Sequence, residues 1–67
     1  MPVIQVNLMQ GRTPAQKDAF AKEVTEAAVR NLGVKPEAVR VLLNELPAAH
    51  WYVAGAAKSP PTPPGGL

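Results

Sequence analysis

Apolar and polar residues alternate near the start of the chain. Between positions 2 and 9 the apolar positions on one face of an extended strand are Ile4, Val6 and Leu8. Alternation with a period of two, rich in β-branched residues, predicts a β-strand over residues 2–9. Gly11 ends this strand, so a connection to the next element is expected there.

The following segment has the residues and termini of an α-helix over residues 14–32. Thr13 is the expected N-cap, Gln16 completes a capping box with it, and Pro14 lies where a helix tolerates proline. Gly33 is expected as the left-handed C-cap. The apolar residues at helical spacing, which predict the buried stripe, are Phe20, Val24, Ala27, Ala28 and Leu32.

A second alternating segment predicts a strand over residues 39–46, preceded by a single helical turn that opens at Pro36 and ended by Pro47. Strand, helix and strand in this order predict a β-α-β unit with parallel strands and a right-handed crossover. A short hairpin is expected between positions 48 and 57. The fold class is therefore α/β, a two-layer arrangement of one small sheet and one helix.

The chain ends in a proline- and glycine-rich segment over residues 58–67, which holds four of the eight prolines. Such a segment cannot enter the interior of a sheet and is expected to be extended or disordered. The predicted organisation is thus one domain over residues 1–57 and a tail over residues 58–67.

Composition adds a constraint on stability. The chain has 67 residues, 46% of them apolar, with no cysteine and one histidine, His50. A core of this size seldom contributes more than about 3–5 kcal/mol without disulfides, a structural metal or oligomerisation. Disulfides and a Cys/His metal site are excluded, so association with further copies is expected. A single β-α-β unit also leaves two sheet edges and one sheet face uncovered.

The charge pattern indicates no macromolecular partner of another kind. The net charge is +2, and the seven Lys and Arg residues occur singly, without aromatic residues between them. This pattern lacks the features of nucleic-acid binding. No apolar stretch approaches the ~20 residues of a membrane span, and no signal-peptide pattern is present. A cytoplasmic location is expected.

Three residues are the candidates for chemistry. Pro2 follows the initiator methionine, and removal of Met1 would leave it with a free secondary amine. An apolar wall from Leu8 or Trp51 and nearby cations would lower the pKa of this amine, as a base for proton transfer next to a carbonyl requires. The alternative is that Pro2 only begins an edge strand.

The cations are two arginines. Arg12 precedes a helix N-terminus, where a guanidinium and the helix dipole suit a carboxylate, unless it is an ordinary solvated loop arginine. Arg40 lies within an apolar strand and is expected to have an anionic partner, namely Glu45, another chain or a ligand. Together the two arginines would recognise a dianion, or one carboxylate and a developing oxyanion.

These features resemble the 4-oxalocrotonate tautomerase family over residues 2–55. The matching segments are Met1-Pro2-Val3-Ile4, Gly11-Arg12-Thr13 with Gln16-Lys17, Val39-Arg40-Val41 with Asn44-Glu45, and Trp51 before Gly55. The resemblance implies a β-α-β protomer assembled as a homohexamer, with sites at subunit interfaces and no metal or other cofactor. It also implies an isomerase acting on 2-hydroxymuconate-like dienols.

The family's site residues map onto this chain one by one. The resemblance implies that Pro2 is the general base and acid, and that Arg12 binds the remote carboxylate of a small-molecule substrate. It implies that Arg40, from a neighbouring subunit, holds the near carboxylate and polarises the 2-oxo group. Trp51 matches an aromatic that keeps the pocket apolar, and the backbone N–H of Met9 matches a contact to substrate or water.

Two alternatives remain open at this point. One keeps the fold but changes the reaction to hydration or dehalogenation of a haloacrylate, with Glu45 as the carboxylate that activates water. The other is a non-catalytic oligomeric scaffold whose Pro60–Pro64 segment is a polyproline ligand. Deletion of residues 59–67 would abolish partner binding in the second case and leave tautomerisation intact.

Overall fold

A computed structural model describes residues 1–58; the predicted tail, apart from Lys58, lies outside these residues. The elements, in chain order, are β1 (Val3–Met9), α1 (Pro14–Leu32), η1 (Pro36–Ala38), β2 (Arg40–Leu46), η2 (Ala48–His50), β3 (Tyr52–Val53) and β4 (Ala56–Ala57), where η marks a 3₁₀ turn. The β-α-β prediction, the turn at Pro36 and the hairpin after Pro47 are all confirmed.

Strands β1 and β2 form a parallel ladder from Val3 opposite Arg40 to Met9 opposite Leu46. A further hydrogen bond extends each end of the ladder. The Arg40 N–H donates to the Pro2 carbonyl at 2.9 Å, and the Gln10 N–H donates to the Leu46 carbonyl at 2.9 Å. Both strands begin one residue later than predicted, because Pro2 in the intact chain has no N–H for the ladder.

The predicted helix termini are confirmed. The Gln16 N–H donates to the Thr13 hydroxyl at 3.1 Å, and the Thr13 N–H donates to the Gln16 side-chain oxygen at 2.9 Å. Gly33 has φ 66° and ψ 34°, and its N–H donates to the Val29 carbonyl at 3.2 Å. These bonds supply partners for terminal N–H and C=O groups that otherwise have none at the two ends of α1.

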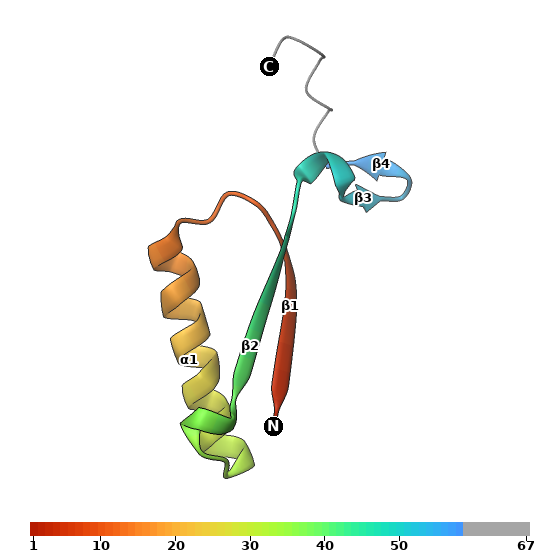
Figure 1. Ribbon diagram of the computed structural model, residues 1–67. Coiled ribbons are helices and arrows are strands. Elements are labelled where there is room, and N and C mark those ends of the chain that lie inside the picture. The colour runs from red at the N-terminus through yellow and green to blue at the C-terminus, as the bar shows by residue number, and fades with distance from the viewer. Residues whose placement is uncertain (59–67) are drawn as a thin grey trace.

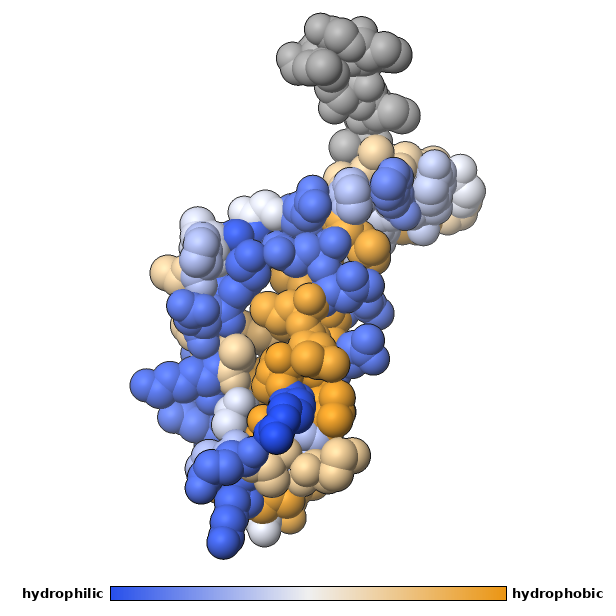
Figure 2. All heavy atoms as spheres, in the orientation of Figure 1, coloured by the Kyte–Doolittle hydropathy of each residue, from blue (hydrophilic) through white to orange (hydrophobic). Residues whose placement is uncertain are grey.

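Helix α1 covers one face of the two-stranded sheet and leaves the other face open (Figure 1). Within the described residues only Ala28 is buried, at 6% exposure. The predicted apolar stripe is therefore only partly correct, because Phe20 at the amino-terminal half of α1 and Leu32 at its end remain 43% and 61% exposed. Figure 2 shows an apolar band along the strands that lies open on this face of the described residues.

The hairpin of β3 and β4 lies at the end of the sheet opposite the N-terminus (Figure 1). Its strands are joined by a two-residue turn at Ala54–Gly55, and the Lys58 N–H closes it on the Trp51 carbonyl at 2.8 Å. Tyr52 and Val53 are mostly exposed on it. Among the described helices, none has the length and apolar character that a membrane crossing requires.

Replacing Gly33 by alanine tests the helix cap. A Cβ at this position would meet no atom within 4 Å, so the cost comes from the left-handed backbone alone. We expect Gly33→Ala to lower the free energy of unfolding by about 1 kcal/mol, measured by urea denaturation at one protein concentration. Gly33→Asn, which tolerates this conformation, should lose less. Equal stability of the alanine variant and the parent would contradict the cap.

Candidate active site

The amino-terminal end of the sheet brings Pro2, Arg40 and the turn η1 together. The backbones of Pro2 and Arg40 are joined by the ladder bond described above. The Arg40 guanidinium donates from Nη1 to the Glu37 carbonyl at 2.6 Å, and the Met1 ammonium donates to the Ala38 carbonyl at 2.9 Å. Two successive carbonyls of η1 therefore hold the two cationic groups at this end.

The environment expected for Arg40 is partly wrong. Arg40 is the first residue of β2, and its side chain is exposed. In the alternation of β2 it shares the uncovered sheet face with Leu42. Glu45 is not its partner, because Glu45 lies at the other end of β2 and accepts a hydrogen bond from Lys17 at 3.0 Å.

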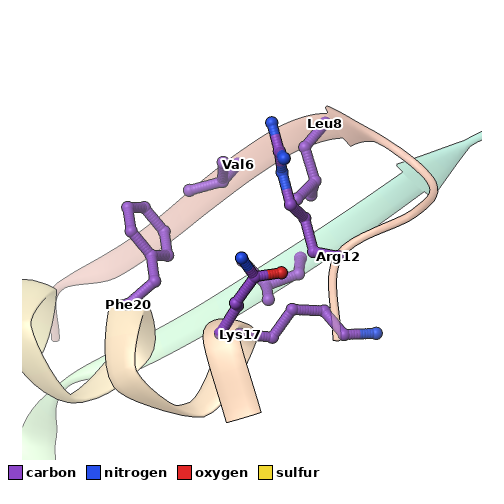
Figure 3. Close-up of a pocket in the computed structure, with 7 residues that line it drawn as sticks. Val6, Leu8, Arg12, Lys17 and Phe20 are labelled. Carbon is purple, nitrogen blue, oxygen red and sulfur yellow. The ribbon is translucent and has the colours of Figure 1, made fainter. Parts of the chain in front are cut away.

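Arg12 lies at the opposite end of the sheet, beside a groove of about 380 Å³ between α1 and β1. The groove is lined by Val6, Leu8, Arg12, Gln16, Lys17, Phe20 and Leu43. Figure 3 shows Phe20 of α1 facing Val6 of β1, with the guanidinium of Arg12 beside Leu8. A mostly apolar groove with a cationic rim fits an anionic end of a small organic molecule.

The backbone at Gly11 sets the position of Arg12. Gly11 has φ 125°, a conformation that a residue with a side chain rarely adopts, and it turns the chain from β1 into the N-terminus of α1. Arg12 is exposed, and within residues 1–58 its guanidinium forms no ion pair. It is thus available to an anion from outside the chain.

Lys17 has a role that the sequence does not signal. Its ammonium lies 3.0 Å from the Glu45 carboxylate, and both side chains are about two-thirds buried, at 26% and 32% exposure. The pair joins the first turn of α1 to the end of β2, next to Arg12. No local pattern in the sequence signals it, because the two residues are distant in the chain and meet only when β2 pairs with β1.

Met9 and Trp51 lie at the same end as Arg12. The ladder uses the even-numbered N–H groups of β1, as the Gln10 bond to Leu46 shows, so the Met9 N–H points to the open edge of the strand. Trp51 is half-buried between η2 and β3, with its carbonyl held by Lys58.

One chain does not bring the five predicted site residues into one place. Pro2 and Arg40 lie at one end of the ladder, and Met9, Arg12 and Trp51 lie at the other. Leu8 lies six positions after Pro2 along the extended strand, which is roughly 20 Å at ~3.3 Å per residue. The apolar wall that was expected beside Pro2 from its own Leu8 or Trp51 is therefore absent within the described part of one chain.

Comparisons with known proteins show which family this chain belongs to. The sequence model of the Tautomerase enzyme family matches residues 2–59. A relative from Ralstonia nicotianae, named a probable tautomerase, is 54% identical over 91% of this chain and 93% of its own. A 2-hydroxymuconate tautomerase from Pseudomonas putida is 37% identical over 88% of this chain and 94% of its own. The chain belongs to the tautomerase family.

Solved structures show the same similarity in three dimensions. A structure from work on the 4-oxalocrotonate tautomerase isozymes of Methylibium petroleiphilum has a TM-score of 0.82 and 49% identity, covering 85% of this chain and 89% of that one. A structure from the heterohexamer 4-oxalocrotonate tautomerase of Chloroflexus aurantiacus has a TM-score of 0.82 and 29% identity, with coverages of 87% and 94%. The small β-α-β fold with a C-terminal hairpin is thus that of the 4-oxalocrotonate tautomerases.

The Lys17–Glu45 pair can be tested by its salt dependence. Because both groups remain partly in water, Glu45→Gln should lower the free energy of unfolding by less than about 1 kcal/mol, and 1 M NaCl should shrink the difference. Urea unfolding of the parent, Glu45→Gln, Lys17→Met and the double variant gives the coupling between the two residues. A coupling of zero at low salt would contradict a stabilising pair.

Proposed function

We propose that this chain is a cofactor-independent enol–keto tautomerase that acts on a 2-hydroxymuconate-like dienol. Pro2, freed by removal of Met1, is the general base and acid. The observation that carries the proposal is the position of Pro2 at the head of β1, hydrogen-bonded through its carbonyl to the Arg40 backbone. Two relatives named for 2-hydroxymuconate and 4-oxalocrotonate support the substrate class.

The reaction is a proton transfer within one substrate. The neutral Pro2 amine takes the proton of the 2-hydroxyl group, and the electrons of that O–H bond form the 2-oxo group. The double bonds shift by one position, and the Pro2 ammonium returns its proton to a carbon of the former diene. No oxidant, reductant or cofactor enters the balance, because the product has the same atoms as the substrate.

Two arginines bind the substrate in this proposal. Arg40 holds the carboxylate next to the reacting oxygen and stabilises the negative charge that develops on it. Arg12 binds the remote carboxylate, for which its exposed guanidinium beside an apolar groove, with no ion-pair partner among residues 1–58, is suited. Both cations also favour the neutral form of the amine and lower the pKa of Pro2.

A shared site explains how these residues meet. A second copy placed antiparallel beside the open edge of β1 would bring its Arg12 end to the Pro2 end of the first chain. Its apolar surface would also cover Phe20, which one chain leaves 43% exposed. The Arg40 side chain, on the uncovered sheet face, is presented to a further copy. We therefore propose a homo-oligomer, a hexamer by analogy with the family, with sites between subunits.

Met9 and Trp51 complete the pocket of the proposed site. The Met9 N–H, directed to the β1 edge, offers a hydrogen bond to substrate or water in the neighbouring copy's site. Trp51 supplies an apolar wall on the same edge of the assembly. The hydratase alternative gains no support, because its required carboxylate, Glu45, is paired with Lys17. The segment Pro60–Pro64 of the scaffold alternative lies outside the described residues.

Pro2→Ala tests the catalytic group. On protein whose mass shows that Met1 is absent, the variant should lose about 10²–10⁴-fold in kcat/KM for 2-hydroxymuconate ketonisation, followed by ultraviolet absorbance. The loss reflects the altered geometry and basicity of the primary amine. A parent sample that retains Met1 should be similarly inactive, because Pro2 is then an amide. Turnover of Pro2→Ala at the parent rate would overturn the proposal.

Arg12→Gln tests recognition of the remote carboxylate. Its kcat/KM for the dicarboxylate 2-hydroxymuconate should fall by about 10–100-fold, since a charge-assisted hydrogen bond is lost. A monocarboxylate 2-hydroxydienoate is the matched control, and Arg12→Gln should process it nearly as well as the parent does. Equal losses on both substrates would place Arg12 elsewhere in the mechanism.

The two variants together test whether the site is shared between chains. Pro2→Ala and Arg12→Gln are each unfolded, mixed in equal amounts and refolded together. With random pairing, half of the pairs are mixed and one of their two sites is intact, so about a quarter of the parent's activity should return. No recovery in a mixture that is shown to exchange subunits would mean that Pro2 and Arg12 of one chain serve the same site.

A further inference from the structure

The register of the sheet assigns a hydrogen-bond partner to the Pro2 nitrogen. In a parallel ladder the bonds repeat every two residues, and one residue of a strand directs its N–H and its carbonyl to the same neighbour. At the far end of β1 the Gln10 N–H donates to the Leu46 carbonyl. Moving along the ladder from Gln10 two residues at a time reaches Pro2, and the matching carbonyl is that of Ala38.

The bond on the other side of the same residue supports this register. The Pro2 carbonyl accepts from the Arg40 N–H at 2.9 Å, so Pro2 faces β2 and not the open edge. In the intact chain the Pro2 nitrogen is a tertiary amide and has no proton to donate. The Ala38 carbonyl accepts instead from the Met1 ammonium at 2.9 Å. The Ala38 carbonyl therefore accepts a hydrogen bond from a cationic N–H group at the chain terminus.

We infer that in the processed protein the Ala38 carbonyl is the hydrogen-bond acceptor that orients the Pro2 amine. A neutral secondary amine has one N–H and one lone pair. When the N–H is directed to Ala38, the lone pair must point away from β2, toward the position of the substrate. After proton transfer the ammonium has two N–H groups, one on Ala38 and one available to return its proton to the substrate.

The turn η1 makes Ala38 suitable for this role. The Ala38 N–H donates to the Lys35 carbonyl at 3.0 Å, and the Val39 N–H donates to the Pro36 carbonyl at 3.1 Å. These two bonds and the ring of Pro36 fix the peptide that carries the Ala38 carbonyl. The preceding carbonyl, of Glu37, is occupied by Arg40 at 2.6 Å. Neighbouring peptides of one turn thus serve two different functional groups.

The bond has an electrostatic consequence of known sign. A carbonyl accepts a stronger hydrogen bond from an ammonium than from a neutral amine, so it favours the charged form and raises the pKa of Pro2. It opposes the effect of the arginines. A change that makes the Ala38 carbonyl a weaker acceptor should therefore lower the pKa of Pro2. General loosening of the fold would instead expose the amine and weaken the effects of both the carbonyl and the arginines, so it would not produce this selective decrease.

Backbone esters separate the two carbonyls of η1. The chain of residues 2–67 is assembled by chemical synthesis with ¹⁵N-proline at position 2. Replacing Val39 by 2-hydroxyisovaleric acid turns the 38–39 amide into an ester, whose carbonyl, that of Ala38, is a weaker acceptor. The matched control replaces Ala38 by lactic acid, which weakens the Glu37 carbonyl. Each change also removes one hydrogen bond of the same turn, and neither alters a side chain.

The readout is the pKa of Pro2 from its ¹⁵N chemical shift, which does not depend on activity. The ester at Val39 should lower this pKa by about 0.5–1 unit, and the ester at Ala38 should change it much less. In kinetics the Val39 ester should move the acidic limb of kcat/KM to lower pH and reduce its plateau. An unchanged pKa in the folded Val39 ester, or the same shift in both esters, would overturn the inference.

A measurement on the unaltered chain covers the case in which an ester does not fold. With ¹³C at the Ala38 carbonyl, its chemical shift should follow the same midpoint as the Pro2 ¹⁵N signal across the titration, while a ¹³C-labelled Leu46 carbonyl stays flat. A flat Ala38 signal would overturn the inference. The role given to this hydrogen bond rests on the proposed function. The two can fail separately, because a chain without turnover whose Pro2 and Ala38 signals still titrate together would contradict the function and not the hydrogen bond.

Discussion

The parallel pairing of β1 and β2 positions most of the candidate residues of this protein. Seven residues of each strand are aligned in one register, and both ends of the ladder are extended by a further hydrogen bond. At one end the register places Pro2 beside Arg40 and the carbonyls of η1. At the other end it brings Glu45 within reach of Lys17 and leaves Arg12 at the rim of an apolar groove.

The same arrangement limits what one chain can do alone. One helix on one face of two strands gives a thin core, so Phe20, Leu32 and Leu42 stay about half exposed. Small domains of this kind need support beyond their own core, and this chain has no disulfide to supply it. In the homo-oligomer proposed above, a second copy beside β1 would cover apolar surface and would also bring its Arg12 to the Pro2 of the first chain.

Much of the fold was predictable because its signals are local. The capping box of Thr13 and Gln16, the left-handed Gly33 and the alternation in β1 each depend on residues a few positions apart. The misassigned details depend on distant contacts. Phe20 has the spacing of a core residue, but one chain has too little surface to cover it. Glu45 is a possible partner of Arg40 in the sequence, whereas the register of the strands places it beside Lys17.

By itself the sequence determined the order and type of the elements, the two arginines and the proline at position 2, because residue chemistry and short-range periodicity require no knowledge of the rest of the chain. Only the tertiary structure decided which of these residues are neighbours. Hydrogen bonds across a sheet join residues far apart in sequence, so the pairing of Pro2 with Arg40 and of the chain terminus with Ala38 exists only once β1 and β2 are in register.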